Sequence, residues 1–230
     1  MKQNTKSFIR SNFPASVPIY NWIRSLRSSF KTPGLEEVFS DIYLNNSWAD
    51  QESVSGPGST MTRTENVRRE LPGLLESIGA TSLLDAACGD FNWMRHTDLL
   101  GIEYLGVDIV PQLIARNQQL HGDRNRKFLI LDITRDALPR TDVILCRDCL
   151  IHLCFDDGRA AVENFKSSGS AFLLATTHPT VTENLAIASG GWRNLNLQLQ
   201  PYNFPAPRRL IIEEAERGKH LGLWHLQDVA

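Results

Sequence analysis

The chain has 230 residues, of which 42% are hydrophobic and 22% are charged, and its formal net charge is −2. This length accommodates one substantial α/β domain with an appendage, but not comfortably two full domains. The ordinary composition argues against a coiled coil, a largely disordered chain and a bulk nucleic-acid binder.

Positive charge is concentrated in the first 35 residues, which carry six basic side chains, five aromatic side chains and no acid. Such a basic arm can contact a membrane surface or an acidic partner, RNA included, although no specific nucleic acid is predicted. Packing of the arm against the acidic remainder of the chain, or partial disorder, explains the same composition.

The sequence favours a cytoplasmic protein. No apolar run approaches the ~18 residues of a transmembrane helix. Arg10, Asn12 and Pro14 interrupt any signal-peptide core. The four cysteines lack the spacing of a disulfide framework, which favours a reducing compartment.

Two helices and a polar loop are predicted before the regular part of the chain. Residues 35–46 form a short helix with Leu35, Val38, Phe39 and Ile42 on one face. A Gly/Ser/Pro-rich loop follows, and an amphipathic helix extends from Thr64 to about Ile78 despite Pro72.

Apolar strands then alternate with helical stretches. The predicted strands are 82–86, 103–109, 127–133, 142–148 and 171–177, and the predicted helices are 91–100, 110–121 and 149–169. Short apolar strands in such an alternation indicate a parallel sheet covered on both faces. Right-handed crossovers make the sheet doubly wound, with ligands at the carboxyl ends of the strands.

The last third of the chain departs from this alternation. Residues 179–207 show no clear period, whereas 208–215 and 219–226 are predicted strands joined by the turn-like "ERGK". So short a connection requires antiparallel strands. The predicted fold is therefore α/β, with a doubly wound, mostly parallel seven-stranded sheet, a C-terminal antiparallel hairpin and an N-terminal helical or irregular extension.

Three aspartates lie at the ends of successive predicted strands: Asp85, Asp108 and Asp132. They should therefore line one edge of the sheet. The turn after the first strand contains Gly89 and leaves backbone N–H groups exposed. Asp108 follows Gly89 by nineteen residues, close to the ~20-residue spacing at which a strand-two carboxylate accepts the two hydroxyls of a ribose.

Residues 64–230 resemble the class I S-adenosylmethionine-dependent methyltransferases. The motifs are "LLDAACGDF", "YLGVDIV", "LDIT" and "DVILCRDCLIHL" in the family's order. With "GDFNWM", "WRNLNL" and "YNFP" added, the chain looks closest to a little-characterised bacterial group of that superfamily. The resemblance implies a basic arm and cap segment at 1–60 and a cofactor-binding methyltransferase domain at 61–230.

The resemblance also implies a cofactor site. The implied residues are Asp85, Ala86, Ala87, Cys88, Gly89, Asp90, Asp108, Ile109, Asp132, Ile133 and Arg147. The 86–90 backbone would cradle the methionine part, with Asp85 organising the loop or the amino group and Arg147 nearby. Asp108 would bind the ribose, and Asp132 with the Ile133 backbone would meet the adenine.

Two family glycines of the first motif are replaced, by Ala87 and Phe91. We expect Phe91 to point into helix–sheet packing, with Asp90 as the helix N-cap.

No metal is predicted. Cys146 and Cys149, with His152 and Cys154 nearby, have spacing that invites a zinc interpretation. However, Cys146 should close a strand, and Cys149 and Cys154 should point away from each other on the predicted helix. The paired acids of a magnesium-dependent branch are also missing.

Three side chains are candidate general bases for a hydroxyl acceptor: Asp148, His152 and His178. Each histidine can equally be a packed structural residue. The segment after the fifth strand is expected to cover the site and contact the acceptor through Trp192, Arg193, Asn194, Asn196, Tyr202 and Asn203. The loop around 52–60, with Arg63, can close over the cofactor from the other side.

The predicted function is methyl transfer from S-adenosylmethionine to oxygen, with nitrogen as second choice, of a small polar or glycosidic acceptor. Two alternatives stay open. One is a catalytically inactive cofactor-binding module that acts through a partner, which the replaced glycines favour. The other is a nicotinamide-dependent oxidoreductase, whose G-x-G-x-x-G fingerprint is represented only by Gly89.

Overall fold

The computed structural model describes residues 33–99 and 101–229. Residues Leu35–Ala230 form one compact unit. The basic arm predicted for the N-terminus falls almost entirely outside the described residues, so its role stays a prediction, as does a domain boundary at residue 60.

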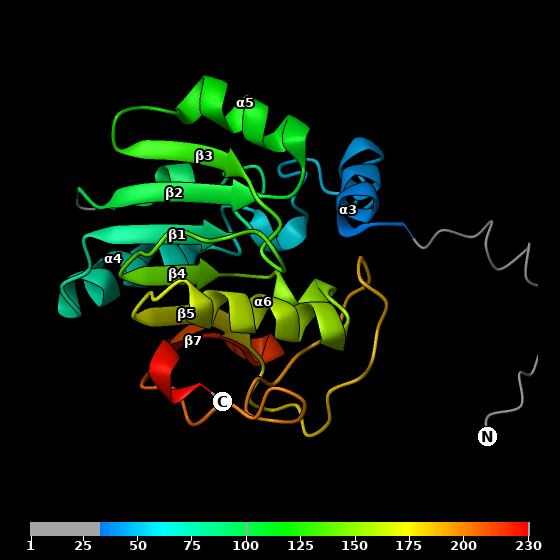
Figure 1. Ribbon diagram of the computed structural model, residues 1–230, viewed down its shortest axis with the longest axis vertical. Coiled ribbons are helices and arrows are strands. Elements are labelled where there is room, and N and C mark those ends of the chain that lie inside the picture. Colours follow the sequence, from blue (N-terminus) through cyan, green and yellow to red (C-terminus); the bar gives the residue numbers. More distant parts are fainter. Residues whose placement is uncertain (1–32, 100, 230) are drawn as a thin grey trace, which may run out of the picture. The chain divides into compact units, whose positions relative to one another are not determined.

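A seven-stranded sheet in the order β3-β2-β1-β4-β5-β7-β6 organises this unit (Figure 1). Its strands are β1 (Ser82–Ala86), β2 (Glu103–Asp108), β3 (Arg126–Ile130), β4 (Val143–Cys146), β5 (Phe172–Thr177), β6 (Arg209–Glu214) and β7 (Lys219–His225). Strands β1 to β5 run parallel, while β7 is antiparallel to both β5 and β6. The predicted sheet and its C-terminal hairpin are confirmed.

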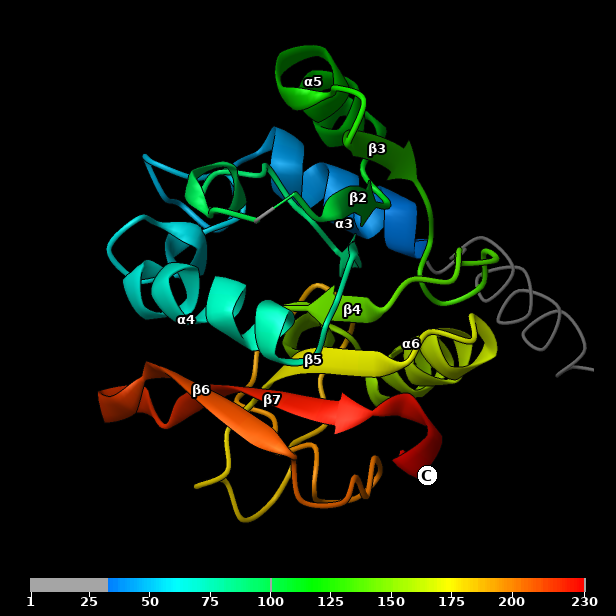
Figure 2. The ribbon, with the colours of Figure 1, turned by 90° about the vertical axis from the view of Figure 1, so that its left-hand side faces the viewer.

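Helices cover both faces of the sheet. Helices α4 (Glu65–Ser77) and α6 (Phe155–Ser167) lie on opposite faces (Figure 2). Helix α5 (Pro111–His121) contributes Ile114 to the core on the α4 side. Adjacent residues of β1 are buried on opposite faces of the sheet, because successive side chains of a strand point to opposite faces. Leu83 packs on the α4 side and Leu84 on the α6 side. The central strands are apolar because both of their faces are buried.

The predicted helix 91–100 is wrong. The chain makes only a single 3₁₀ turn there, at Met94–His96. Phe91 has a left-handed φ of 59°, a conformation in which a right-handed helix cannot begin. Its side chain is buried as expected and packs on Tyr104 and Phe128, with ring centroids 5.1 Å away in each case. Asp90 therefore caps no helix.

The long predicted helix 149–169 is divided in two. A 3₁₀ turn occupies Leu150–His152, and α6 begins only at Phe155. Cys154 is the N-cap residue, and its Sγ accepts a hydrogen bond from the Asp157 amide. The assumption that Cys149 and Cys154 share one helix was therefore wrong. Strand β3 is also shorter than predicted, so Asp132 lies in the loop that follows it.

Helix α3 (Leu35–Leu44) lies beyond the carboxyl ends of β1 and β2 (Figure 1). Residues 178–207 form an irregular segment that buries Leu195, Leu197, Tyr202 and Phe204 on the α6 side of the core. It thus covers this face of the sheet together with α6. Within the described part of the chain, no helix combines the length and apolar character needed to cross a membrane.

Candidate functional site

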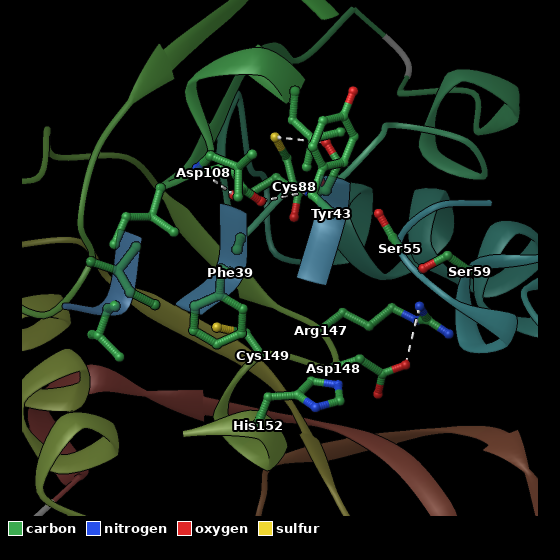
Figure 3. A pocket seen from close by; sticks show the side chains of 18 of the residues that line it. Phe39, Tyr43, Ser55, Ser59, Cys88, Asp108, Arg147, Asp148, Cys149 and His152 are labelled. Carbon is green, nitrogen blue, oxygen red and sulfur yellow. Dashed lines mark hydrogen bonds and ion pairs between the residues drawn. The ribbon is translucent and has the colours of Figure 1, made fainter. Parts of the chain in front are cut away.

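A cavity opens at the carboxyl edge of the sheet, where β1, β2 and β4 end (Figure 3). Its far wall comes from α3 and the loop that follows it. The lining residues are Leu35, Phe39, Tyr43, Trp48, Val54, Ser55, Ser59, Asp85, Ala87, Cys88, Gly89, Trp93, Asp108, Ile109, Val110, Leu113, Asp132, Ile133, Thr134, Arg147, Asp148, Cys149, His152 and Leu153.

The three strand-end aspartates meet at this cavity, as predicted. The Asp108 carboxylate accepts hydrogen bonds from the Gly89 and Val110 amides, each at 3.0 Å. It therefore ties the end of β2 to the turn after β1. Asp132 accepts bonds from the Thr134 amide at 2.9 Å and hydroxyl at 2.6 Å, and pairs with Arg135 at 3.1 Å.

Asp85 is 3% exposed in an otherwise apolar strand. Its partner is the Tyr104 hydroxyl, which donates a 2.7 Å hydrogen bond to Oδ2. Burial raises the pKa of Asp85 to about 7, although this hydrogen bond and the charge of Arg147 act in the opposite direction. The carboxyl group is therefore poised to lose its proton near neutral pH.

The turn between β1 and residue 91 requires a glycine at position 89. Gly89 has a φ of 54°, and a Cβ added there would lie 2.2 Å from the Ser55 hydroxyl oxygen. Ala87 and Cys88 line the cavity beside it, whereas Ala86 is buried in the core and Asp90 lies outside the lining. Nine of the eleven expected cofactor-binding positions therefore line the cavity, Ile109 and Ile133 among them, and two do not.

Arg147 follows β4 and is held by a network of buried charges. Its guanidinium contacts Glu213 and pairs with Asp148 at 3.3 Å, while Nη2 donates to the Gly58 carbonyl at 2.6 Å. Lys219 lies 3.0 Å from Glu213 and also bonds Asp148. Pairing of this kind is what makes buried charges tolerable.

Asp148 and His152, two of the candidate bases, line the cavity together (Figure 3). Burial acts to raise the pKa of Asp148, but Arg147 and Lys219 outweigh it and hold the pKa well below its usual range. So weakly basic a carboxylate is a poor proton acceptor.

Burial lowers the pKa of His152, so the imidazole is neutral at physiological pH. Its Nδ1 lies 2.7 Å from the Gly191 carbonyl oxygen, which only accepts hydrogen bonds. Nδ1 therefore carries the proton, and Nε2 keeps its lone pair.

The third candidate base, His178, lies away from the cavity lining. It is buried beside the irregular segment, where the Leu195 amide donates to its Nδ1 at 3.2 Å. Burial lowers its pKa. The interpretation of His178 as a packed structural residue fits this position.

None of the six expected acceptor-binding residues lines the cavity. Arg193, Asn196 and Tyr202 are buried against the core, whereas Trp192, Asn194 and Asn203 are exposed. The guanidinium of Arg193 stacks 4.7 Å from the Phe155 ring centroid. The segment approaches the site through its backbone, at Gly191, rather than through these side chains.

The sequence reasoning missed the wall contributed by α3. Leu35, Phe39 and Tyr43 recur every fourth residue and face the cavity, so their helical spacing was a usable signal. Trp48 and Trp93 had no periodic signal. Trp48 lies against His152, with ring centroids 5.0 Å apart. In the described ranges, no cluster of three or more metal-ligating His, Cys, Asp or Glu side chains occurs.

Comparison with known proteins places the fold. No protein-family model and no curated protein sequence matches the chain significantly. Human N-acetylserotonin methyltransferase, crystallised with S-adenosylmethionine, is similar with a TM-score of 0.57 at 13% identity. That match covers 84% of this chain and 60% of the human chain.

Two further solved structures are similar at lower TM-scores. Magnesium protoporphyrin IX methyltransferase from Synechocystis PCC 6803 gives 0.49 at 15% identity, covering 64% of this chain and 72% of its own. The N-methyltransferase NodS from Bradyrhizobium japonicum WM9 gives 0.48 at 17% identity, covering 59% and 72%. The sheet order and the match to the human enzyme show that the protein has the class I methyltransferase fold, and similarity at such identities concerns the fold alone.

Proposed function

We propose that the protein is a methyltransferase that uses S-adenosylmethionine and methylates an oxygen atom of a small polar acceptor. The observation that carries the proposal is the convergence of Asp85, Asp108 and Asp132 on one cavity at the carboxyl edge of the sheet. Ligands of open α/β sheets bind at this edge.

The charges of the cavity fit this cofactor. Four acidic side chains line it, those of Asp85, Asp108, Asp132 and Asp148, against the single guanidinium of Arg147. Even with Asp85 only partly ionised near neutral pH, because burial raises its pKa to about 7, the acids outnumber the guanidinium. Arg147 is itself held by Glu213 and Asp148. A ligand carrying both a sulfonium and an ammonium group complements this negative excess better than the anionic diphosphate of a nicotinamide cofactor does.

Each part of the cofactor has a candidate partner. Asp108 would hold the ribose hydroxyls, Asp132 and the Ile133 backbone the adenine, and the 87–89 turn with Asp85 the methionine part. When bound, the cofactor supplies a methyl group already made electrophilic by the sulfonium. The protein then has to orient the acceptor and accept a proton.

His152 is the proton acceptor that the geometry favours. Its neutral ring keeps Nδ1–H on the Gly191 carbonyl and leaves Nε2 free to receive a hydroxyl proton. This is why oxygen is preferred to nitrogen, which is the second choice. The glycosidic part of the prediction rests on the composition of residues 192–203 alone, since those side chains do not line the cavity.

Thermal unfolding with three ligands tests the proposal. S-adenosylmethionine and S-adenosylhomocysteine should each stabilise the protein by ~2.7 kcal/mol at a hundred times Kd, whereas NAD should not. Stabilisation by NAD alone would contradict the proposal and favour an oxidoreductase. Asp108→Ala should abolish the shift.

A catalytically inactive cofactor-binding module is the second candidate, because alanine and phenylalanine replace two glycines of the first motif. Cofactor labelled in its methyl group separates the two. We expect label in one fraction of a lysate separated into proteins and metabolites. Binding without transfer into any fraction favours the module, with the basic arm as its contact to a membrane surface or acidic partner.

A further inference from the structure

Asp90 holds a distant segment rather than a helix. Its Oδ2 accepts hydrogen bonds from the Ser53 hydroxyl at 2.8 Å and the Val54 amide at 3.0 Å. Its Oδ1 accepts one from the Ser55 hydroxyl at 3.2 Å, and the Asp90 amide donates to that hydroxyl oxygen at 2.8 Å. One carboxylate next to Gly89 thus fixes three consecutive residues of the loop that follows α3.

The far end of the same loop has its own attachments. Arg147 donates to the Gly58 carbonyl at 2.6 Å, and Asn92 donates to the Ser59 carbonyl at 3.1 Å. Asn92 also donates to the Glu52 carboxylate at the near end, at 2.8 Å. We name residues 52–59 the latch segment. Its two ends are therefore bound to the loops that end β1 and β4, the same loops that line the cavity.

The latch segment forms part of the cavity wall. Val54, Ser55 and Ser59 line the cavity, and Figure 3 shows Ser55 and Ser59 at its right-hand side, above Arg147. The segment fits closely, because the Ser55 hydroxyl fills the space where a side chain at position 89 would lie. Gly56, with a φ of 90°, supplies a backbone position able to turn.

The attachment at Asp90 is of a kind that can open and close. It consists of hydrogen bonds from neutral groups to one half-buried carboxylate, with no salt bridge and no apolar anchor among them. The Asn92 amide also donates to Oδ1, at 3.2 Å, but from the same turn as Asp90. Because the partners in the distant loop are the consecutive residues 53–55, they detach together. Charge-assisted hydrogen bonds are nevertheless the strong ones, so the closed arrangement dominates.

We propose that Asp90 is a positioning residue that latches segment 52–59 over the cofactor site, and that cofactor exchange requires this latch to open. The inference rests on the proposed function for the identity of the ligand. A closed latch limits association, since only the open fraction of the free protein admits ligand. It also retains bound ligand, so loosening the latch should accelerate both association and dissociation.

Stopped-flow fluorescence tests this, with S-adenosylhomocysteine as the probe and Trp48 and Trp93 in the cavity wall as reporters. Asp90→Asn should raise both rate constants about tenfold, a change in the range expected for hydrogen bonds to a charged group. Ser53→Ala should raise both rates less. Asp156→Asn, which removes an exposed carboxylate paired with Arg159 on α6, should change neither. Faster dissociation with unchanged or slower association would overturn the proposal, because a merely damaged site gives that result.

Hydrogen exchange of the ligand-free protein separates this inference from the proposed function. The Val54 amide is bonded directly to Asp90, so its exchange should accelerate about tenfold in Asp90→Asn and remain unchanged in Asp156→Asn. If no adenosyl compound binds the wild type but Val54 responds in this way, the proposed function fails and the latch stands. Unchanged exchange at Val54 refutes the latch, whatever ligand the cavity takes.

Discussion

The Tyr104 hydroxyl donates a 2.7 Å hydrogen bond to the Asp85 carboxylate inside the sheet. This side-chain contact links β2 to β1, in addition to the backbone pairing of the two strands. Together with burial it governs how Asp85 responds to pH, and that response is measurable in the stability of the protein.

Asp85 should make the protein less stable as pH rises. Its pKa is raised from 3.8 to about 7 on folding, so the folded state keeps a proton that the unfolded state has lost. The contribution of this proton to the free energy of unfolding is complete below about pH 4 and is lost as pH rises towards 7. The full change in pKa corresponds to roughly 4 kcal/mol. In urea titrations at pH 5 and pH 8, Asp85→Asn should become more stable relative to wild type at the higher pH. A difference between the two proteins that does not change with pH would contradict this.

Glu213→Gln should strongly destabilise the fold. The Glu213 side chain is completely buried and compensates Arg147 and Lys219. Its loss leaves buried positive charge without its partner, which costs about 3–5 kcal/mol. The matched control is Glu163→Gln, whose exposed carboxylate pairs with Lys166 on the surface of α6 and should change stability by less than about 0.5 kcal/mol. If the two substitutions changed the free energy of unfolding equally in denaturant titrations, the buried charge network around Glu213 would not stabilise the fold.

His152→Gln should lower kcat by about 10²–10⁴-fold if His152 is the general base. Because burial lowers the pKa of His152, the acidic limb of the wild-type pH profile should lie below pH 6.5, with activity lost as pH falls through it. That limb should disappear in the variant. His178→Gln provides the comparison, since His178 does not line the cavity, and its folded fraction should keep wild-type kcat. If the acidic limb disappeared in His178→Gln and not in His152→Gln, the general base would be His178.

Gly89→Ala should abolish cofactor binding. The new methyl group would lie 2.2 Å from the Ser55 hydroxyl oxygen, on a backbone with φ of 54°, so both space and conformation oppose it. Adding Ser55→Ala removes the nearest atom and should restore binding only in part. Gly73→Ala on α4 is the control, because no atom lies within 4 Å of its Cβ, and helix propensity should stabilise the protein by up to about 1 kcal/mol. Calorimetry with S-adenosylhomocysteine measures each case.

The sheet and the three strand-end aspartates were predictable because they depend on local pattern. Apolar runs bounded by turns indicated every strand, and the four-residue link before Lys219 required the hairpin. The carboxyl ends of parallel strands necessarily share an edge, so Asp85 and Asp108 had to converge.

The remainder depends on contacts between residues far apart in the chain. Asp90 has the character of a helix cap, but its carboxylate binds Ser53, thirty-seven residues away, and no local pattern reveals that preference. The 192–203 segment has the composition of a binding loop, yet Tyr202 is buried in the core cluster that includes α6. His178 and His152 look alike in sequence and differ only in what packs around them.

The central claim is that Asp108 holds a ribose in this cavity. Its most direct test is calorimetry of S-adenosylhomocysteine and the analogue lacking the ribose 2′-hydroxyl, each with wild type and Asp108→Asn. The wild type should bind the complete ligand at least tenfold more tightly than the analogue, and Asp108→Asn should bind the two about equally. Equal binding of both ligands by the wild type, or undiminished discrimination in the variant, would contradict the assignment of this site.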